Sequence, residues 1–171
     1  MWRTRKRSVI DKDGFRANVG IVIANQKGQV FLGKRIGQND SWQFPQGGLM
    51  PRESLQEGLF RELEEEVGLV QKDVEIAAQV RRWIYYRLPE QYIRHHSYPL
   101  CIGQKQKWFL LRLIDDNQLF KLDNHKSPEF DGWEWVDCWE PARRVVEFKQ
   151  HVYREVIKDF EPVIRQWSKA V

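Results

Sequence analysis

Cysteine and histidine are scarce in this sequence, which has two cysteines and four histidines among its 171 residues. Cys101 and Cys138 are too few for a disulfide framework and have no metal-ligand spacing. The histidines are either adjacent, as His95 and His96 are, or isolated, so no two of them form a ligand pair on one helix face. We therefore expect a reducing, cytoplasmic setting and no catalytic histidine.

Long apolar runs are also absent, and no segment approaches the length that crosses a membrane. The amino terminus is basic but continues into polar residues, which excludes a secretory signal peptide. We predict that residues 1–9 are a basic, disordered leader, with a nucleic-acid-binding arm as the alternative. The chain is 42% hydrophobic, so residues 10–171 are sufficient for a single domain with a sizeable core.

Acidic residues are depleted in one internal segment. The net charge of +4 comes from four cations in the first seven residues, and the remainder balances 24 basic against 24 acidic side chains. Between Gln79 and Trp108, six Lys and Arg residues accompany a single acid, Glu90. Cations interleaved with aromatic rings suit an oligonucleotide or a polyphosphate, although two ordinary strands with solvated arginines explain the segment equally well. Its aromatic residues include Trp83, Tyr85, Tyr86, Tyr92 and Tyr98.

The acids gather instead in residues 47–69, which read GGLMPRESLQEGLFRELEEEVGL. A helix of about four turns is predicted here, because Pro51 precedes its start and Gly68 supplies the residue after its end. Glu53 lies in the predicted first turn, where the helix dipole favours an anion. The aliphatic residues fall on one stripe of this helix, so the stripe faces the core.

Three glutamates lie along the edge of that stripe. Glu62, Glu65 and Glu66 fall within roughly 100° of one another on the helix, whereas Glu64 points to the far side. Carboxylates at these spacings repel one another and weaken a bare helix, and a bound cation reverses the effect. A solvated acidic helix face is the alternative for a run of this kind.

An oxygen-only, carboxylate-rich site suits Mg²⁺ or Mn²⁺, whereas Zn²⁺ prefers histidine or cysteine. Magnesium usually borrows phosphate oxygens as further ligands, which directs the interpretation toward phosphate chemistry. The pair Gly47 and Gly48 follows a probable strand, and we predict a flexible turn whose carbonyls approach a metal or a phosphate closely. Gly47 is therefore a candidate metal ligand beside the three glutamates.

The remaining pattern indicates an α/β fold. Short apolar runs at residues 18–24 and 30–34 flank a probable hairpin turn. Strand-like segments follow the acidic helix at residues 74–86, 107–114 and 133–136. From Pro141 the chain becomes helical, and we predict an apolar helical face over residues 142–160.

Residues 47–69 also fill every fixed position of the pattern G-x5-E-x7-R-E-U-x-E-E-x-G-U, where U is a bulky aliphatic residue. The chain therefore resembles the Nudix hydrolases. This resemblance implies an α/β/α sandwich with a central mixed sheet. The residues that fill the pattern are Gly47, Glu53, Arg61, Glu62, Leu63, Glu65, Glu66, Gly68 and Leu69.

Three further stretches, DGFRANVG (13–20), CIGQKQKWF (101–109) and PEFDGW (128–133), resemble the bacterial RNA pyrophosphohydrolase subgroup. Its members have also been described as dinucleoside polyphosphate hydrolases. By this resemblance, Glu129 is a further metal carboxylate, and Arg16 and Arg35 hold the terminal phosphates. The same resemblance implies that Phe148 and Lys149 line the path of the first base and the RNA backbone. A surface glutamate and an ordinary amphipathic helix pair are the alternatives for Glu129 and for residues 148–149.

The expected activity is removal of phosphates from the 5′ end of triphosphorylated or diphosphorylated RNA, which leaves a monophosphate and promotes mRNA decay. Two or more Mg²⁺ ions, or Mn²⁺, would lower the pKa of an attacking water, with Glu65 or Glu66 taking its proton. We assign Glu53 and Arg61 to bracing the junction of loop and helix. Hydrolysis of dinucleoside polyphosphates is the alternative activity, and non-catalytic binding of RNA ends is a distant third.

Overall fold

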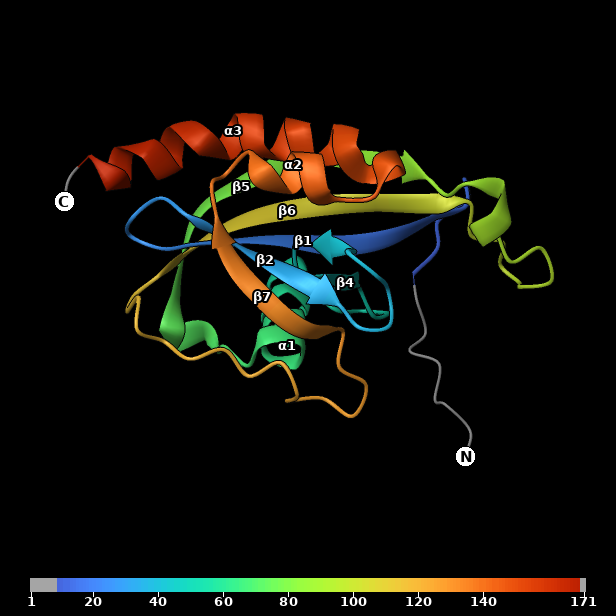
Figure 1. Ribbon diagram of the computed structural model, residues 1–171. Helices are drawn as coiled ribbons and strands as arrows, with labels where there is room; N and C mark the ends of the chain where they lie inside the picture. The colour runs from blue at the N-terminus through green and yellow to red at the C-terminus, as the bar shows by residue number, and fades with distance from the viewer. Residues whose placement is uncertain (1–8, 170–171) are drawn as a thin grey trace.

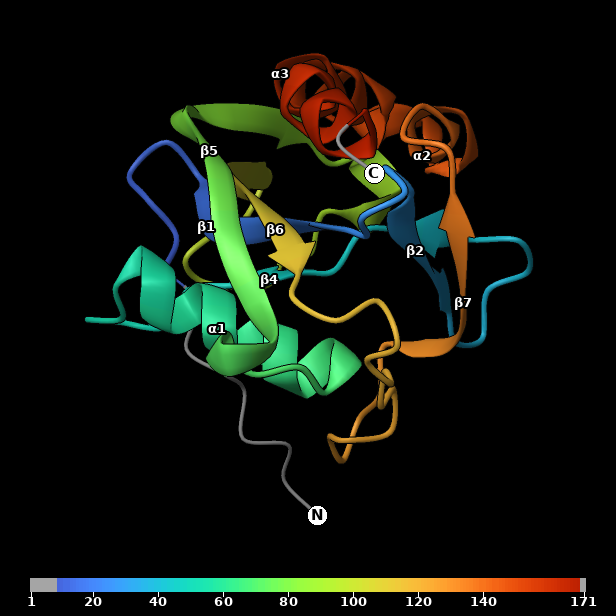
Figure 2. The ribbon, with the colours of Figure 1, turned by 90° about the vertical axis from the view of Figure 1, so that its left-hand side faces the viewer.

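A computed structural model describes residues 9–169 as a mixed β-sheet between helices. Helix α1 lies against one face of the sheet, and α2 and α3 cover the other, as Figures 1 and 2 show from two directions. The predicted α/β/α sandwich is confirmed. The basic residues of the predicted leader lie outside the described residues, and of the leader only Val9 lies within them, where its carbonyl accepts a hydrogen bond from the Ala17 amide.

The seven strands form one sheet in the order β3-β2-β1-β6-β5, with β4 paired to β1 and β7 paired to β2. Strands β1 and β6 run parallel, and every other pair is antiparallel. The strands are β1 (Phe15–Ala24), β2 (Val30–Arg35), β3 (Trp42–Gln43), β4 (Gln46–Gly48), β5 (Val74–Arg87), β6 (Gly103–Leu113) and β7 (Phe130–Val136). The helices are α1 (Leu55–Val67), α2 (Glu140–Arg144) and α3 (Gln150–Ser168), with 3₁₀ turns η1 (Gln71–Asp73), η2 (Glu90–Tyr92) and η3 (Glu147–Lys149).

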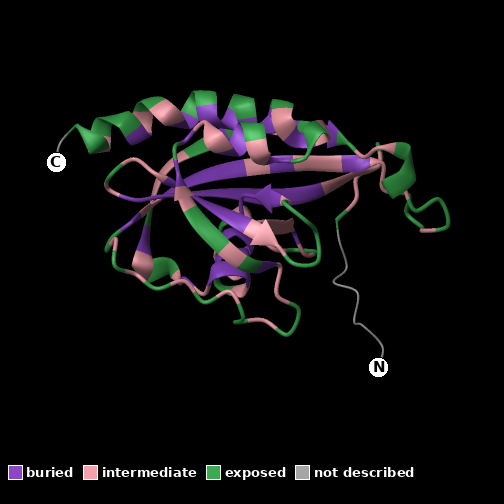
Figure 3. Cartoon of the chain, viewed as in Figure 1, coloured by how far each residue is buried: buried purple, intermediate pink, exposed green. Residues whose placement is uncertain are grey.

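Strand β1 divides the core into two layers, because alternate side chains of a strand point to opposite faces. Val22 and Ala24 belong to the layer beneath α3, while Val19, Ile21 and Ile23 belong to the layer above α1. A strand buried on both faces reads as a continuous apolar run, which is why residues 18–24 show no polar alternation. Figure 3 shows the resulting buried centre of the sheet.

Helix α1 starts later than predicted. Ser54 is its N-cap and accepts a hydrogen bond from the Glu57 amide, while the Glu57 carboxylate accepts one from the Ser54 amide. This capping box places Glu53 before the helix, so the prediction that Glu53 lies in the first turn is wrong. The predicted end is confirmed, since Gly68 has a left-handed φ of 73°.

One other local prediction is wrong. The glycine pair does not form a flexible turn, because Gly47 and Gly48 belong to strand β4 and pair with Val19 and Asn18 of β1. The apolar face predicted over residues 142–160 is divided between α2, η3 and α3, because extended backbone at Val145 ends α2 before η3 and α3 begin. Among residues 9–169, no helix combines the length and apolar character needed to cross a bilayer.

Candidate metal and phosphate site

Charged side chains approach strand β4 closely from both faces, because its two glycines have no side chains. A Cβ atom on Gly47 would lie 1.9 Å from the carboxyl carbon of Glu62, and one on Gly48 would lie 2.5 Å from Nη2 of Arg16. Successive residues of a strand point to opposite faces, so Glu62 approaches β4 from one side and Arg16 from the other. The two glycines are therefore required for close approach and not for turn flexibility.

The four carboxylates predicted to bind metal all line one cavity beside α1. Glu66 is buried, and its Oε2 accepts a hydrogen bond from the Gln46 amide at 3.0 Å. Burial raises the pKa of Glu66 well above its ordinary value, and the charges of Glu62, Glu129 and Glu65 raise it further. A divalent cation beside these carboxylates would offset that repulsion and favour their ionised forms.

Two of these carboxylates are held by arginines. Nη1 of Arg61 makes a short hydrogen bond to Glu62, and Nε of Arg35 donates to Oε1 of Glu129 at 3.0 Å. Within residues 9–169, no three acidic, histidine or cysteine side chains already stand in a geometry that could hold a metal ion. The donor set fits Mg²⁺ or Mn²⁺ in its chemistry, because it offers only oxygen ligands and includes a buried carboxylate.

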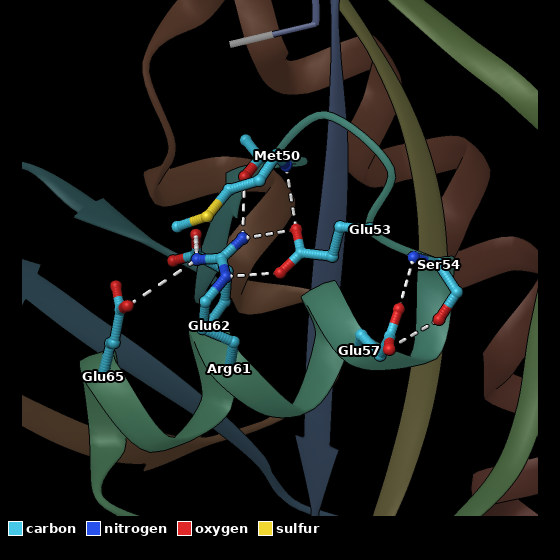
Figure 4. A network of polar contacts seen from close by, with 8 residues as sticks. Met50, Glu53, Ser54, Glu57, Arg61, Glu62 and Glu65 are labelled. Atoms are coloured by element: carbon cyan, nitrogen blue, oxygen red, sulfur yellow. Dashed lines mark hydrogen bonds and ion pairs between the residues drawn. The ribbon is translucent and has the colours of Figure 1, made fainter. Parts of the chain in front are cut away.

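Arg61 links the start of α1 to strand β4 (Figure 4). Its Nε and Nη2 donate to the two carboxylate oxygens of Glu53 at 2.6 and 2.8 Å, and Nη2 also donates to the Gly48 carbonyl at 2.9 Å. Glu53 in turn accepts a hydrogen bond from the Met50 amide at 2.8 Å. The Glu53 carboxylate raises the pKa of Arg61, so this side chain stays charged. These contacts support the predicted bracing role, with Arg61 also reaching the carboxylates themselves.

A single cavity of about 720 Å³ contains nearly all of the predicted site. Carboxylates, arginines, a lysine and aromatic rings all line it. Glu53 and Arg61 stand outside this lining, as expected for bracing residues. The predicted residues that line the cavity are Arg16, Arg35, Gly47, Glu62, Glu65, Glu66, Glu129, Phe148 and Lys149.

Lys149 is a buried cation in this cavity, with 7% of its surface exposed. Its Nζ donates to Oε1 of Gln43 at 3.2 Å and lies 5.5 Å from the ring centroid of Tyr86. Burial and then the charge of Arg35 lower the pKa of Lys149 to about 8. Lys149 is therefore still mainly protonated near pH 7, and a nearby anion would favour its charged form further.

The basic, aromatic segment between Gln79 and Trp108 divides between two places. Tyr86 and Tyr92 reach the cavity, where the ring of Phe148 lies 5.8 Å from the first and 5.9 Å from the second. Arg82 instead pairs with Glu155 and Asp159 of α3, outside the cavity lining. The segment therefore contributes some residues to the cavity and others to ion pairs with α3.

Sequence reasoning missed several residues that line the cavity. His125 and Ser127 lie on the loop that carries Glu129, and no motif marked them. Four amide side chains, those of Asn18, Gln43, Gln46 and Gln104, also line it. Position along β1 could have indicated Asn18, because Arg16 and Asn18 are two residues apart and so share one face of the strand.

A family model described as NUDIX domain matches residues 14–159. The chain belongs to this family. The RNA pyrophosphohydrolases of Pseudomonas syringae pv. syringae (strain B728a) and Pseudomonas putida (strain GB-1) are each 56% identical to it over 154 residues. Those residues cover 90% of this chain and 96% of each relative. The predicted resemblance to the Nudix family and to its RNA pyrophosphohydrolase subgroup is confirmed.

Solved NUDIX structures share the fold at low identity. The Escherichia coli dihydroneopterin triphosphate pyrophosphohydrolase aligns with a TM-score of 0.66 at 20% identity, over 84% of this chain and 95% of that one. A Caenorhabditis elegans Ap4A hydrolase in a binary complex aligns with a TM-score of 0.61 at 16% identity, over 82% and 93% of the two chains. NUDIX hydrolases use divalent metal ions, which agrees with the oxygen-only donor set of this chain.

Proposed function

We infer that this protein is a metal-dependent RNA 5′-pyrophosphohydrolase, which converts 5′-triphosphate or 5′-diphosphate RNA ends to 5′-monophosphates in the cytoplasm. The single observation that carries this inference is the cavity itself. Four carboxylates line it together with Lys149, Phe148 and two tyrosines. A phosphate chain at the carboxylates would leave the first nucleotides of an RNA near the aromatic rings of the same cavity. Names of the 56% identical relatives support the same activity.

Glu62, Glu65, Glu66 and Glu129, with the Gly47 carbonyl, are the groups that would hold Mg²⁺ or Mn²⁺. Bound ions of this kind offset phosphate charge and make a bound water more acidic. Glu65 or Glu66 accepts the proton of the attacking water, which adds to phosphorus as the phosphoric anhydride bond breaks. Arg16, which lines the same cavity, offsets the charge of the phosphate chain. The products are an RNA with a 5′-monophosphate and the released pyrophosphate or phosphate.

Arg35 and Lys149 are also linked to the carboxylate Glu129. Arg35 pairs with Glu129 directly. Lys149 contacts Gln43, which itself donates to Glu129 at 3.3 Å. A phosphate chain would draw these cations away from Glu129 and so make that carboxylate available to metal. Substrate and metal are therefore expected to strengthen each other's binding.

Two other functions remain to be separated by experiment. A dinucleoside polyphosphate would use the same carboxylates and the same aromatic rings, and it differs only in replacing an RNA chain by a second nucleoside. A non-catalytic RNA-end binder has no use for the buried Glu66, whose ionisation is disfavoured by burial and by three neighbouring carboxylates.

The test uses purified protein, Mg²⁺, and an RNA carrying a 5′-triphosphate labelled at its terminal and, separately, at its first phosphate. We expect release of the terminal label as pyrophosphate or phosphate, with the first phosphate kept on the RNA. Diadenosine tetraphosphate is assayed in parallel at equal concentration. An RNA end that stays intact while the dinucleotide is cleaved would overturn the proposal in favour of the alternative, and inertness toward both would favour the binder.

A further inference from the structure

The wall that β5 and β6 form at the cavity has a second side. Tyr86 and Gln104 pair across the two strands, and both line the cavity. The neighbouring pair, Tyr85 and Lys105, points to the opposite face of the sheet, because successive side chains of a strand alternate. The α1 face of these strands therefore carries its own set of side chains directly behind the cavity.

Two lysines of β6 share one aromatic ring on this face. Nζ of Lys105 lies 4.9 Å from the ring centroid of Trp83, and Nζ of Lys107 lies 5.0 Å from it. Trp83 itself packs against the core layer above α1. The ring attracts each ammonium group, but the two like charges repel one another.

Tyr85 and Arg87 extend this surface along β5. The ring of Tyr85 lies edge-on to Phe15 with centroids 5.0 Å apart, and 46% of the Tyr85 surface is exposed. Arg87 lies two residues further on the same face and is exposed. We call this set the β5–β6 surface, and none of its members lines the cavity. It consists of Trp83, Tyr85, Arg87, Lys105 and Lys107.

The positive charge of the β5–β6 surface is only partly offset. Nζ of Lys105 pairs with Oδ2 of Asp11 at 2.9 Å. In the part of the chain that the structure describes, residues 9–169, neither Arg87 nor Lys107 forms an ion pair. Three cations thus face one carboxylate, and an anionic ligand would relieve their repulsion.

Both the charges and the rings match a single-stranded nucleic acid. Lysine and arginine attract backbone phosphates, and an exposed aromatic ring stacks on a base whatever its sequence. Tyr85 provides such a ring between the cations. The position of the surface also fits, because β5 is the last strand on its side of the sheet. A chain that leaves the cavity past Tyr86 has to cross only this one edge to reach Tyr85.

We propose that the β5–β6 surface binds the single-stranded RNA that follows the 5′ end held in the cavity. Arg87, Lys105 and Lys107 contact backbone phosphates, and Tyr85 stacks on a base. The surface gives affinity for RNA length and not for the state of the 5′ end. This inference rests on the proposed action on RNA.

Arg154 and Lys158 of α3 provide a matched control. Both are exposed, and helix α3 covers the opposite face of the sheet. Within residues 9–169 they also form no ion pair, so their removal deletes the same charge as removal of Arg87 and Lys107. Neither double substitution breaks an ion pair of the fold.

The experiment compares Arg87→Gln/Lys107→Gln with Arg154→Gln/Lys158→Gln in the full-length protein. Affinities are measured for a 5′-hydroxyl RNA of about 20 nucleotides and for a 5′-triphosphate dinucleotide, the latter in a Glu65→Gln background that slows turnover. We expect the first variant to bind the long RNA about 10-fold more weakly at about 0.1 M salt and the dinucleotide equally well. Its plot of log affinity against log salt should be shallower by about 1.4, since two phosphate contacts are lost.

The control variant should keep both affinities and the salt dependence. Equal weakening of the long RNA by both variants, or weakening of the dinucleotide by the first, would overturn the β5–β6 surface. Tm values are measured for each protein and should match the parent. If the double variant does not fold, Arg87→Gln alone decides, with about half the change in salt dependence expected.

Tyr85→Ala separates stacking from charge. It should weaken binding of the long RNA at least about 5-fold and leave the salt dependence unchanged. Full affinity in this variant would exclude single-stranded RNA as the ligand. The binding of 5′-hydroxyl RNA does not require turnover. Absence of RNA hydrolysis with these length effects intact therefore contradicts the proposed function, whereas hydrolysis without them contradicts the surface.

Discussion

The two faces of strand β4 carry different kinds of polar group, and the protein treats them differently. On the α1 face, Glu62 is paired with Arg61, and Glu66 accepts the Gln46 amide. On the α3 face, Arg16 Nε and Asn18 Nδ2 have no partner among residues 9–169. The two carboxylates of the α1 face thus have hydrogen-bond partners, whereas these two donor atoms of the α3 face have none among those residues. This division is expected if metal binds at one face and Arg16 offsets the charge of a phosphate chain at the other.

The largest effect should come from Glu66→Gln, which removes one carboxylate from the α1 face of β4. Turnover should fall about 100- to 10,000-fold, because the variant loses a metal carboxylate and a candidate base. The Tm should not fall in the absence of metal, since burial and three acidic neighbours disfavour the charged form of Glu66. Initial rates and thermal unfolding without Mg²⁺ test both statements. Unchanged turnover would remove Glu66 from the site.

The glycine pair allows each face to be disturbed separately. Gly47→Ala places a methyl group against the Glu62 carboxylate, and turnover should fall by about 100-fold with the fold retained. Gly48→Ala instead presses on the end of the Arg16 side chain, which should raise KM for 5′-triphosphate RNA with a smaller change in kcat. Steady-state kinetics of the two variants should therefore separate the faces. Identical effects on kcat would contradict the division.

The bracing of the acidic face is tested by Arg61→Ala. The side chains of Arg61 and Glu53 are 18% and 11% exposed, so Arg61→Ala removes the guanidinium from beside a largely buried carboxylate. The free energy of unfolding should fall by about 3 kcal/mol. Arg82→Ala is the control, because this arginine is 52% exposed and its pairs with α3 should contribute less than about 1 kcal/mol. Urea unfolding measures both.

The smallest effect concerns the charge of Lys149 between the two faces. With its pKa lowered to about 8, Lys149 is protonated below that pH and loses its charge above it. KM for 5′-triphosphate RNA should therefore rise several-fold between about pH 7 and pH 9 as the cation is lost. Lys149→Arg should flatten this profile, since arginine stays charged throughout. A profile unaltered by the substitution would assign the titration to another group.

Local signals identified the acidic helix well because its chemistry is contained in one continuous segment. The periodicity of residues 55–67 depends only on helix geometry, and the end at Gly68 follows from its left-handed backbone. The start was misplaced because Pro51 is the more obvious marker, whereas the capping box of Ser54 and Glu57 decides it. Glu129 could be included only by resemblance. Nothing in its spacing relates it to the three glutamates of the helix, which lie 63 to 67 positions earlier in the sequence.

The role of the glycine pair shows the same limit. In sequence, Gly47 and Gly48 predict a turn, because two adjacent glycines are typical of flexible backbone. In the fold they are strand residues between Glu62 and Arg16, and their lack of side chains is a matter of space. Their neighbours come from positions 15 residues later and 32 residues earlier, which local reasoning does not compare.

By itself, the sequence determined the α/β class, the NUDIX helix and the carboxylates on its edge, because these follow from helix and strand periodicity over short segments. Only the tertiary structure decided which groups share the cavity and which of them have partners. Asn18 illustrates the reason: its sequence neighbours make it an ordinary strand residue. The parallel pairing of β1 with β6 and the antiparallel pairing with β4 place its unused donor beside Arg16 and Gln104, through contacts between distant segments.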